Sequence, residues 1–181
     1  MMRGARARLE SARRGELRPA VAVATTALVM LALARFGPSG RALGAVFLLC
    51  VVAALAVVDL EQRRIPNRIV LPAIAAVLAA QIALDPSRAP ALLAISLACG
   101  LFFCLPLLVS PGGVGMGDVK LAVLLGAALG QAVVLAIAVA VIAAFFVALA
   151  ILLQNGAAAR KSAIAFGPFL ALGAAVAIFL G

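Results

Sequence analysis

The sequence contains no histidine, tryptophan or tyrosine, and only six of its 181 residues are acidic. Without histidine the chain has no means of forming a Ser-His-Asp or Cys-His hydrolytic site, a His-ligated zinc centre or a histidine proton shuttle. Any hydrolytic or proton-transfer chemistry must therefore use the carboxylates. They are Glu10, Glu16, Asp59, Glu61, Asp85 and Asp118.

Charged residues of both signs are also scarce, at 12% of the chain, whereas 67% of the residues are hydrophobic. Soluble domains are typically about 25% charged and about 45–50% apolar. The mean hydropathy of +1.28 agrees with this imbalance. We therefore predict an all-α fold, a polytopic bundle of membrane-spanning helices.

The net charge of +9 does not indicate a nucleic-acid partner, because the only aromatic residues are nine phenylalanines, most of them inside apolar runs. The three cysteines, Cys50, Cys99 and Cys104, also lie within apolar runs and form no CxxC pair. Such cysteines usually act as small buried hydrophobes. We expect no metal site, no disulfide framework and no cofactor.

Seven apolar stretches are visible, and a membrane span needs about 20 residues. We predict six to seven transmembrane segments within a domain of residues 19–181, preceded by a basic tail of residues 1–18. The fifth stretch is short, and Gly126 and Gly130 separate it from the sixth, which predicts close helix packing and a turn near Gly130. Whether the fifth helix spans fully stays open. The stretches are 19–36, 41–58, 67–84, 89–109, 119–130, 131–153 and 162–181.

The basic residues indicate which side of the membrane each loop faces, because inner loops are rich in Lys and Arg. If the N-terminus is cytoplasmic and each stretch crosses once, twelve of the fifteen basic residues face the cytoplasm. We therefore expect a multi-pass protein of the bacterial inner membrane whose basic tail contacts lipid headgroups. A cleaved signal peptide is the alternative, because Ala32-Leu33-Ala34 is similar to a cleavage site; we favour an uncleaved first helix.

Two of the six acids lie at the edge of an apolar stretch, where desolvation of a carboxylate costs free energy. Asp59 ends the second stretch and Asp118 begins the fifth, so the predicted topology brings both to the cytoplasmic boundary. Acids at the edge of an apolar span are functional candidates, although each alone is also explained as a helix cap or an interfacial charge. Asp85 precedes Pro86 in a polar turn on the outer side, for which a structural role is expected.

Together, Asp59 and Asp118 suggest a specific chemistry. Two carboxylates in a site of low dielectric share one proton, and aspartic proteases use such a pair to activate water. Gly115 and Gly117 would allow the backbone to approach a substrate closely. Lys120 either compensates charge or extends to the headgroups.

Three motifs resemble the type IV prepilin peptidases, the GxGD class of intramembrane aspartic proteases. Residues 114–120, Val-Gly-Met-Gly-Asp-Val-Lys, are similar to the family's GxGDxK signature. Residues 59–67, Asp-Leu-Glu-Gln-Arg-Arg-Ile-Pro-Asn, resemble its first aspartate motif, and residues 166–169, Phe-Gly-Pro-Phe, its C-terminal segment. The resemblance covers residues 41–181 and implies that Asp59 and Asp118 are the catalytic pair.

The resemblance further implies an enzyme that removes the short basic leader of prepilin-like precursors at the cytoplasmic face. Longer family members carry paired CxxC motifs and also N-methylate the new terminus; those motifs are missing here. The chain resembles the compact form associated with Flp/Tad-type pili, so methylation is not expected. Glu61 falls where many members have a second acid; it either tunes Asp59 or faces water with Arg63 and Arg64.

Two other functions stay open. A small proton- or ion-coupled transporter would use intramembrane acids and broken helices, but its polar residues are expected near mid-span, and here they cluster at one boundary. A non-catalytic assembly subunit would not require both aspartate motifs. Of the remaining polar positions, Asn67 is expected to cap the third helix rather than to touch substrate. The substrate, its cleavage preference and the oligomeric state are not specified by the sequence.

Overall fold

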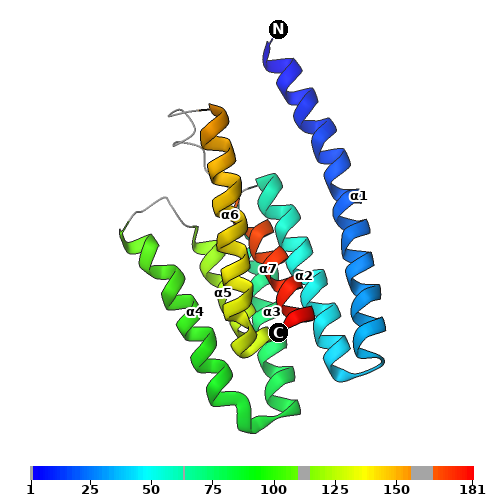
Figure 1. Ribbon diagram of the computed structural model, residues 1–181, viewed down its shortest axis with the longest axis vertical. Helices are drawn as coiled ribbons and strands as arrows, with labels where there is room; N and C mark the ends of the chain where they lie inside the picture. Colours follow the sequence, from blue (N-terminus) through cyan, green and yellow to red (C-terminus); the bar gives the residue numbers. More distant parts are fainter. Residues whose placement is uncertain (1, 63, 110–114, 156–164) are drawn as a thin grey trace.

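The structure is a computed structural model that describes residues 2–62, 64–109, 115–155 and 165–181. Over these ranges the chain is helical and contains no strand, which confirms the predicted all-α bundle (Figure 1). Two single-turn 3₁₀ helices, η1 (Pro86–Arg88) and η2 (Gly130–Ala132), form connections. The α-helices are α1 (Met2–Phe36), α2 (Gly40–Gln62), α3 (Asn67–Leu84), α4 (Ala89–Val109), α5 (Met116–Leu129), α6 (Val133–Asn155) and α7 (Gly167–Leu180).

Helix α1 begins much earlier than the predicted first stretch, because residues 2–18 are helical and continue through Pro19 into the apolar segment. Arg, Ala, Leu and Glu dominate this region, and all four favour helix. The third and fourth predicted stretches coincide with α3 and α4. Three of the charges used to assign sidedness, Arg63, Arg160 and Lys161, lie outside the described residues.

The predicted turn near Gly130 is confirmed. Helix α5 ends at Leu129, η2 follows, and Gly130 takes a φ of 55°, a left-handed conformation that favours glycine. The described helices include five stretches long and apolar enough to cross a membrane, and the last of them, Met116–Gln154, contains both α5 and α6. Because the chain reverses at Gly130, this run forms two antiparallel helices (Figure 1).

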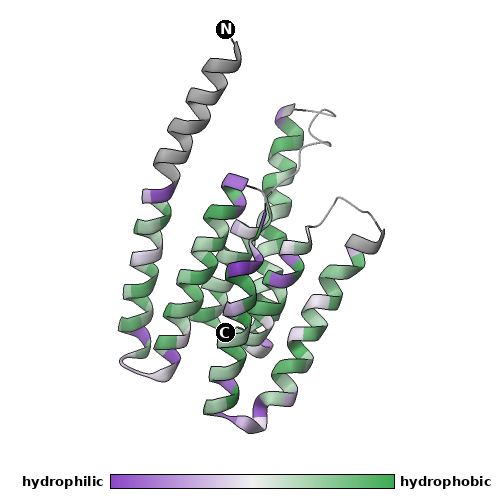
Figure 2. Cartoon of the chain, turned by 180° about the vertical axis from the view of Figure 1, so that it is seen from behind, coloured by the Kyte–Doolittle hydropathy of each residue, from purple (hydrophilic) through white to green (hydrophobic). Residues whose placement is uncertain are grey.

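Helix α5 lies at the centre of the bundle and is buried along most of its length, including Leu121, Leu124 and Leu125. It packs against α3, α4 and α7. A Cβ on Gly126 would lie 2.9 Å from the Cα of Ser96, so this glycine permits the close approach of α4 that its spacing predicted. The outer faces of the helices are largely apolar, and polar residues gather toward the ends (Figure 2).

Helices α5 and α7 are short, with 14 residues each, or about 21 Å at 1.5 Å per residue. Their amino ends lie lower than the carboxyl ends of α2 and α6 in Figure 1. The end of the bundle where α2 finishes and α3, α5 and α7 begin is therefore stepped. Both candidate aspartates lie at this end.

Candidate active site

Asp59 occupies the last turn of α2 and is buried, with 6% of its surface exposed. Its Oδ2 accepts a hydrogen bond of 2.9 Å from the backbone N–H of Gly167, the first residue of α7. The amino end of a helix carries partial positive charge, which favours a carboxylate at this position. The fold thus stabilises a buried acid by placing it against a helix 108 residues further along the chain.

Gly167 is required at this contact because a side chain would collide with the acid. A Cβ there would lie 2.7 Å from Oδ2 of Asp59 and 3.1 Å from its Cβ. Pro168 follows in the first turn of α7, where its missing N–H costs nothing. From the sequence, this Phe-Gly-Pro segment is expected to be a packed helix start with no known catalytic role; α7 does begin here, and Gly167 also supports Asp59.

Asp118 lies in the first turn of α5 and is half-buried. Its Oδ2 accepts a 3.3 Å hydrogen bond from the backbone N–H of Gly115, the residue that begins the helix. This is the carboxylate half of a capping box, so a capping contact of Asp118 is confirmed. Because Gly115 has no side chain, its carbonyl rather than a side-chain oxygen receives the N–H of Asp118.

The two aspartates belong to different motifs but lie at the same end of the bundle. They lie 59 residues apart in the sequence, yet they are near enough for the charge of Asp59 to act on the carboxylate of Asp118. Each also accepts a backbone N–H at the amino end of a short helix. Two carboxylates that interact in this way are coupled, because the protonation of one alters the proton affinity of the other.

Contacts between α3 and α5 bring the two aspartate motifs together. A Cβ on Gly117 would lie 2.8 Å from the Cβ of Ile65. The second glycine of the GxGD motif therefore leaves room for the isoleucine of the first aspartate motif. Lys120 Nζ donates a 2.6 Å hydrogen bond to Oδ1 of Asn67. Neither role predicted for Lys120 included this partner.

The expected capping role of Asn67 was wrong. Pro66 occupies the position before α3, no side chain caps that helix end, and Asn67 begins the helix with its side chain directed to Lys120. The side chain of Asn67 reaches Lys120 on α5. A charged ammonium is a stronger hydrogen-bond donor than the backbone N–H groups that a cap would bind.

Glu61 forms an ion pair that the sequence did not indicate. Arg18 of α1 donates from Nε and Nη2 to the two carboxylate oxygens, at 2.7 and 2.9 Å. The Glu61 side chain is 9% exposed, against 69% for Arg18. The pair joins α1 to α2, the helix that carries Asp59. Its two residues lie 43 positions apart in the sequence, and no sequence pattern links them.

Asp85 lies in the turn between α3 and α4, at the end of the bundle away from Asp59 and Asp118 (Figure 1). The Ser87 hydroxyl donates to its carboxylate and, together with the nearby charge of Arg88, lowers the pKa of Asp85 below its ordinary value. Its predicted structural role is confirmed, because it caps η1 and pairs with Arg88.

Among the described residues, no group of three or more His, Cys, Asp or Glu side chains could hold a metal ion. The three cysteines are free thiols in different settings: Cys99 is buried, Cys104 half-buried and Cys50 exposed. The stepped end holds two carboxylates, each of which accepts a backbone N–H at a helix amino end.

Comparison with known proteins shows the family to which the chain is similar. Residues 46–153 match the model of the type IV leader peptidase family, Peptidase_A24. A prepilin leader peptidase/N-methyltransferase of Burkholderia pseudomallei is 34% identical over 169 residues, 90% of this chain and 54% of its own length. A Bacillus subtilis protein of the same name is 31% identical over 165 residues, 90% of this chain and 66% of its own length. No solved structure matches this chain.

Proposed function

Because this chain belongs to the type IV leader peptidase family, we propose that it is a membrane-embedded aspartic endopeptidase that removes the leader of prepilin-like precursors. The chain spans about half the length of the Burkholderia relative, and the proposal covers peptidase activity alone. The observation that carries it is the convergence of Asp59 and Asp118, each on a backbone N–H at a helix amino end.

In the proposed reaction the two carboxylates share one proton and bind a water molecule. The ionised acid takes a proton from the water, whose oxygen attacks the carbonyl carbon of the scissile bond. The protonated acid donates a hydrogen bond to the carbonyl oxygen as negative charge develops there. Collapse of the tetrahedral intermediate breaks the C–N bond, and the leaving amine receives a proton from the pair.

The site's location supports cleavage close to a membrane surface. Both acids lie near one end of apolar helices, and the amino ends of α5 and α7 are set back from the carboxyl ends of α2 and α6 (Figure 1). An extended peptide at this step would reach the carboxylates while the apolar helix that follows its leader stays in the bilayer. By the distribution of basic residues, we assign this end to the cytoplasmic side.

Asp59→Asn and Asp118→Asn test the proposal in cells that also produce a candidate prepilin. Each substitution preserves size and removes an ionisable proton, so we expect each to slow leader removal at least about a thousandfold, as for other members of an acid–base unit. The measurement is the mobility of the precursor against the mature protein. Asp85→Asn is the matched control, since it alters an acid at the other end of the bundle.

All three variants should be present in the membrane at wild-type amounts, because none fills space or leaves an apolar cavity. Normal processing by either Asp59→Asn or Asp118→Asn would overturn the two-aspartate mechanism. Loss of processing by Asp85→Asn as well would mean that the defect arises from folding rather than from chemistry.

A further inference from the structure

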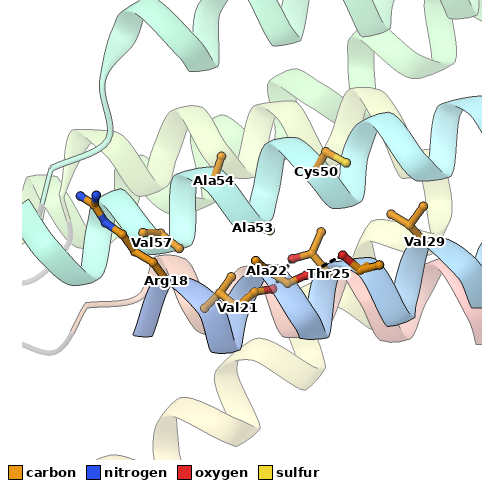
Figure 3. A pocket seen from close by; sticks show the side chains of 10 residues that line it. Arg18, Val21, Ala22, Thr25, Val29, Cys50, Ala53, Ala54 and Val57 are labelled. Carbon is orange, nitrogen blue, oxygen red and sulfur yellow. Dashed lines mark hydrogen bonds between the residues drawn. The ribbon is translucent and has the colours of Figure 1, made fainter. Parts of the chain in front are cut away.

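Helices α1 and α2 are in contact at one end and separate toward the other. Near their connecting turn, Ala32, Leu49 and Ala175 form a small buried cluster. Farther along, α1 leans away from α2 (Figures 1 and 2). Between them lies the α1–α2 groove, formed by one face of α1 from Arg18 to Val29 and one face of α2 from Cys50 to Val57 (Figure 3).

The walls of this groove are apolar and made largely of small side chains. Val21 and Ala22 line it from α1, and Ala53 and Ala54 line it from α2. Thr25 and Thr26 also line the groove, but their hydroxyls donate to the carbonyls of Val21 and Ala22 within α1 (Figure 3). The groove thus offers surface for van der Waals contact rather than for hydrogen bonding.

The mouth of the groove, by contrast, is cationic. Arg18 lies where the apolar part of α1 begins, and an arginine at the end of a span is expected to extend to the lipid headgroups. Two of the five N–H donors of a guanidinium are used by Glu61, and the side chain remains 69% exposed. Residues 1–18 hold six arginines against two glutamates, so this segment of the sequence has a net positive charge.

The groove is open and lies between two apolar helices that are long enough to cross a membrane. Its volume is about 660 Å³. An acyl chain of the surrounding bilayer can lie along its small apolar side chains and supply packing contacts that the walls would otherwise lack.

We propose that the α1–α2 groove binds an anionic phospholipid, with an acyl chain between the helices and the phosphate on Arg18. Charge complementarity at the mouth and the apolar walls together specify this ligand class. The phosphate competes with Glu61 for the same guanidinium, so lipid binding weakens the tie between α1 and the Asp59 helix. The lipid site does not rest on the proposed peptidase activity, and lipid retention is its primary measurement.

The test uses the full chain in nanodiscs that contain phosphatidylglycerol and phosphatidylcholine in equal amounts, with retained lipids counted by native mass spectrometry. One arginine near an anionic headgroup predicts about a fivefold preference for phosphatidylglycerol. Arg18→Gln should abolish the preference, whereas Arg35→Gln, at the other end of α1, should leave it intact. Glu61→Gln frees Arg18 and should raise the preference.

A second experiment blocks the α1–α2 groove with a large side chain. Ala54→Phe fills the groove and should lower retention of both lipids several-fold, while Ala138→Phe, on the exposed side of α6, should not. Equal retention of both lipids by the wild type, or wild-type behaviour of Arg18→Gln, would overturn the proposal. So would displacement by millimolar glycerol phosphate, which would mean a site for free phosphate. Slower prepilin cleavage by Ala54→Phe with unchanged lipid retention would instead assign the groove to a polypeptide helix.

Discussion

The hydrogen bond that supports Asp59 depends on the absence of a side chain at Gly167. The N–H of Gly167 reaches Oδ2 of Asp59 at 2.9 Å only because nothing occupies the space between the two backbones. In Gly167→Ala the new Cβ would lie 2.7 Å from that oxygen, so the carboxylate or α7 must shift. A displacement of about 1 Å at a reacting group costs about a hundredfold in rate, and we expect that loss in leader cleavage.

Gly44→Ala is the control for this substitution, because it places the same methyl group on a helix with no atom within 4 Å. Replacing an exposed helical glycine by alanine stabilises a helix by about 0.5–1 kcal/mol, so Gly44→Ala should cleave at the wild-type rate and unfold no more easily. Equal cleavage rates for the two alanine variants would show that Asp59 does not need the Gly167 contact.

At the scale of elements, α3 and α5 are joined across the site by the bond from Lys120 to Asn67. A hydrogen bond to a charged group contributes about 1.5–3 kcal/mol, and less where water competes, as at the exposed Asn67. We expect Lys120→Met and Asn67→Leu each to slow cleavage several-fold, and the double variant to be no slower than Lys120→Met alone. The cleavage rates of the wild type, the two single variants and the double variant form a double-mutant cycle.

Additive losses in that cycle would mean that Lys120 and Asn67 act separately, for example through contact with substrate. A loss of the same size at every pH in both single variants would further agree with a positioning role. Arg64→Met removes a nearby exposed charge from the same connection and should leave the cleavage rate unchanged.

The elements themselves could be predicted from the sequence, whereas most of their side-chain partners could not. Apolar length marks α3 and α4 to the residue, and Gly130 marks the turn between α5 and α6. The topology also brings Asp59 and Asp118 to one end. However, Arg18 with Glu61 and Gly167 with Asp59 join residues 43 and 108 positions apart, which depends on how helices pack and rotate. Hydropathy contains no information on either.

At the scale of the whole molecule, function depends on which face of the membrane holds the stepped end. The helices alternate in direction, so α2 and α4 finish, and α3 and α5 begin, at the end that holds both aspartates (Figure 1). Inner loops are rich in Lys and Arg, and twelve of the fifteen basic residues fall in sequence segments predicted to face inward, so we propose that this end faces the cytoplasm. A leader cleaved there would be cut before its protein leaves the inner face.

Two matched cysteines test this orientation in a variant whose own three cysteines are replaced by alanine. Arg64→Cys lies beside the aspartates, and Arg41→Cys lies at the opposite end of α2; both positions are exposed. In intact spheroplasts a membrane-impermeant maleimide should label only Arg41→Cys, and permeabilisation should expose Arg64→Cys. Each substitution removes one positive charge, so neither alone reverses the bias. Labelling of Arg64→Cys from outside would place the carboxylates on the outer face, where a cytoplasmic leader would never meet them.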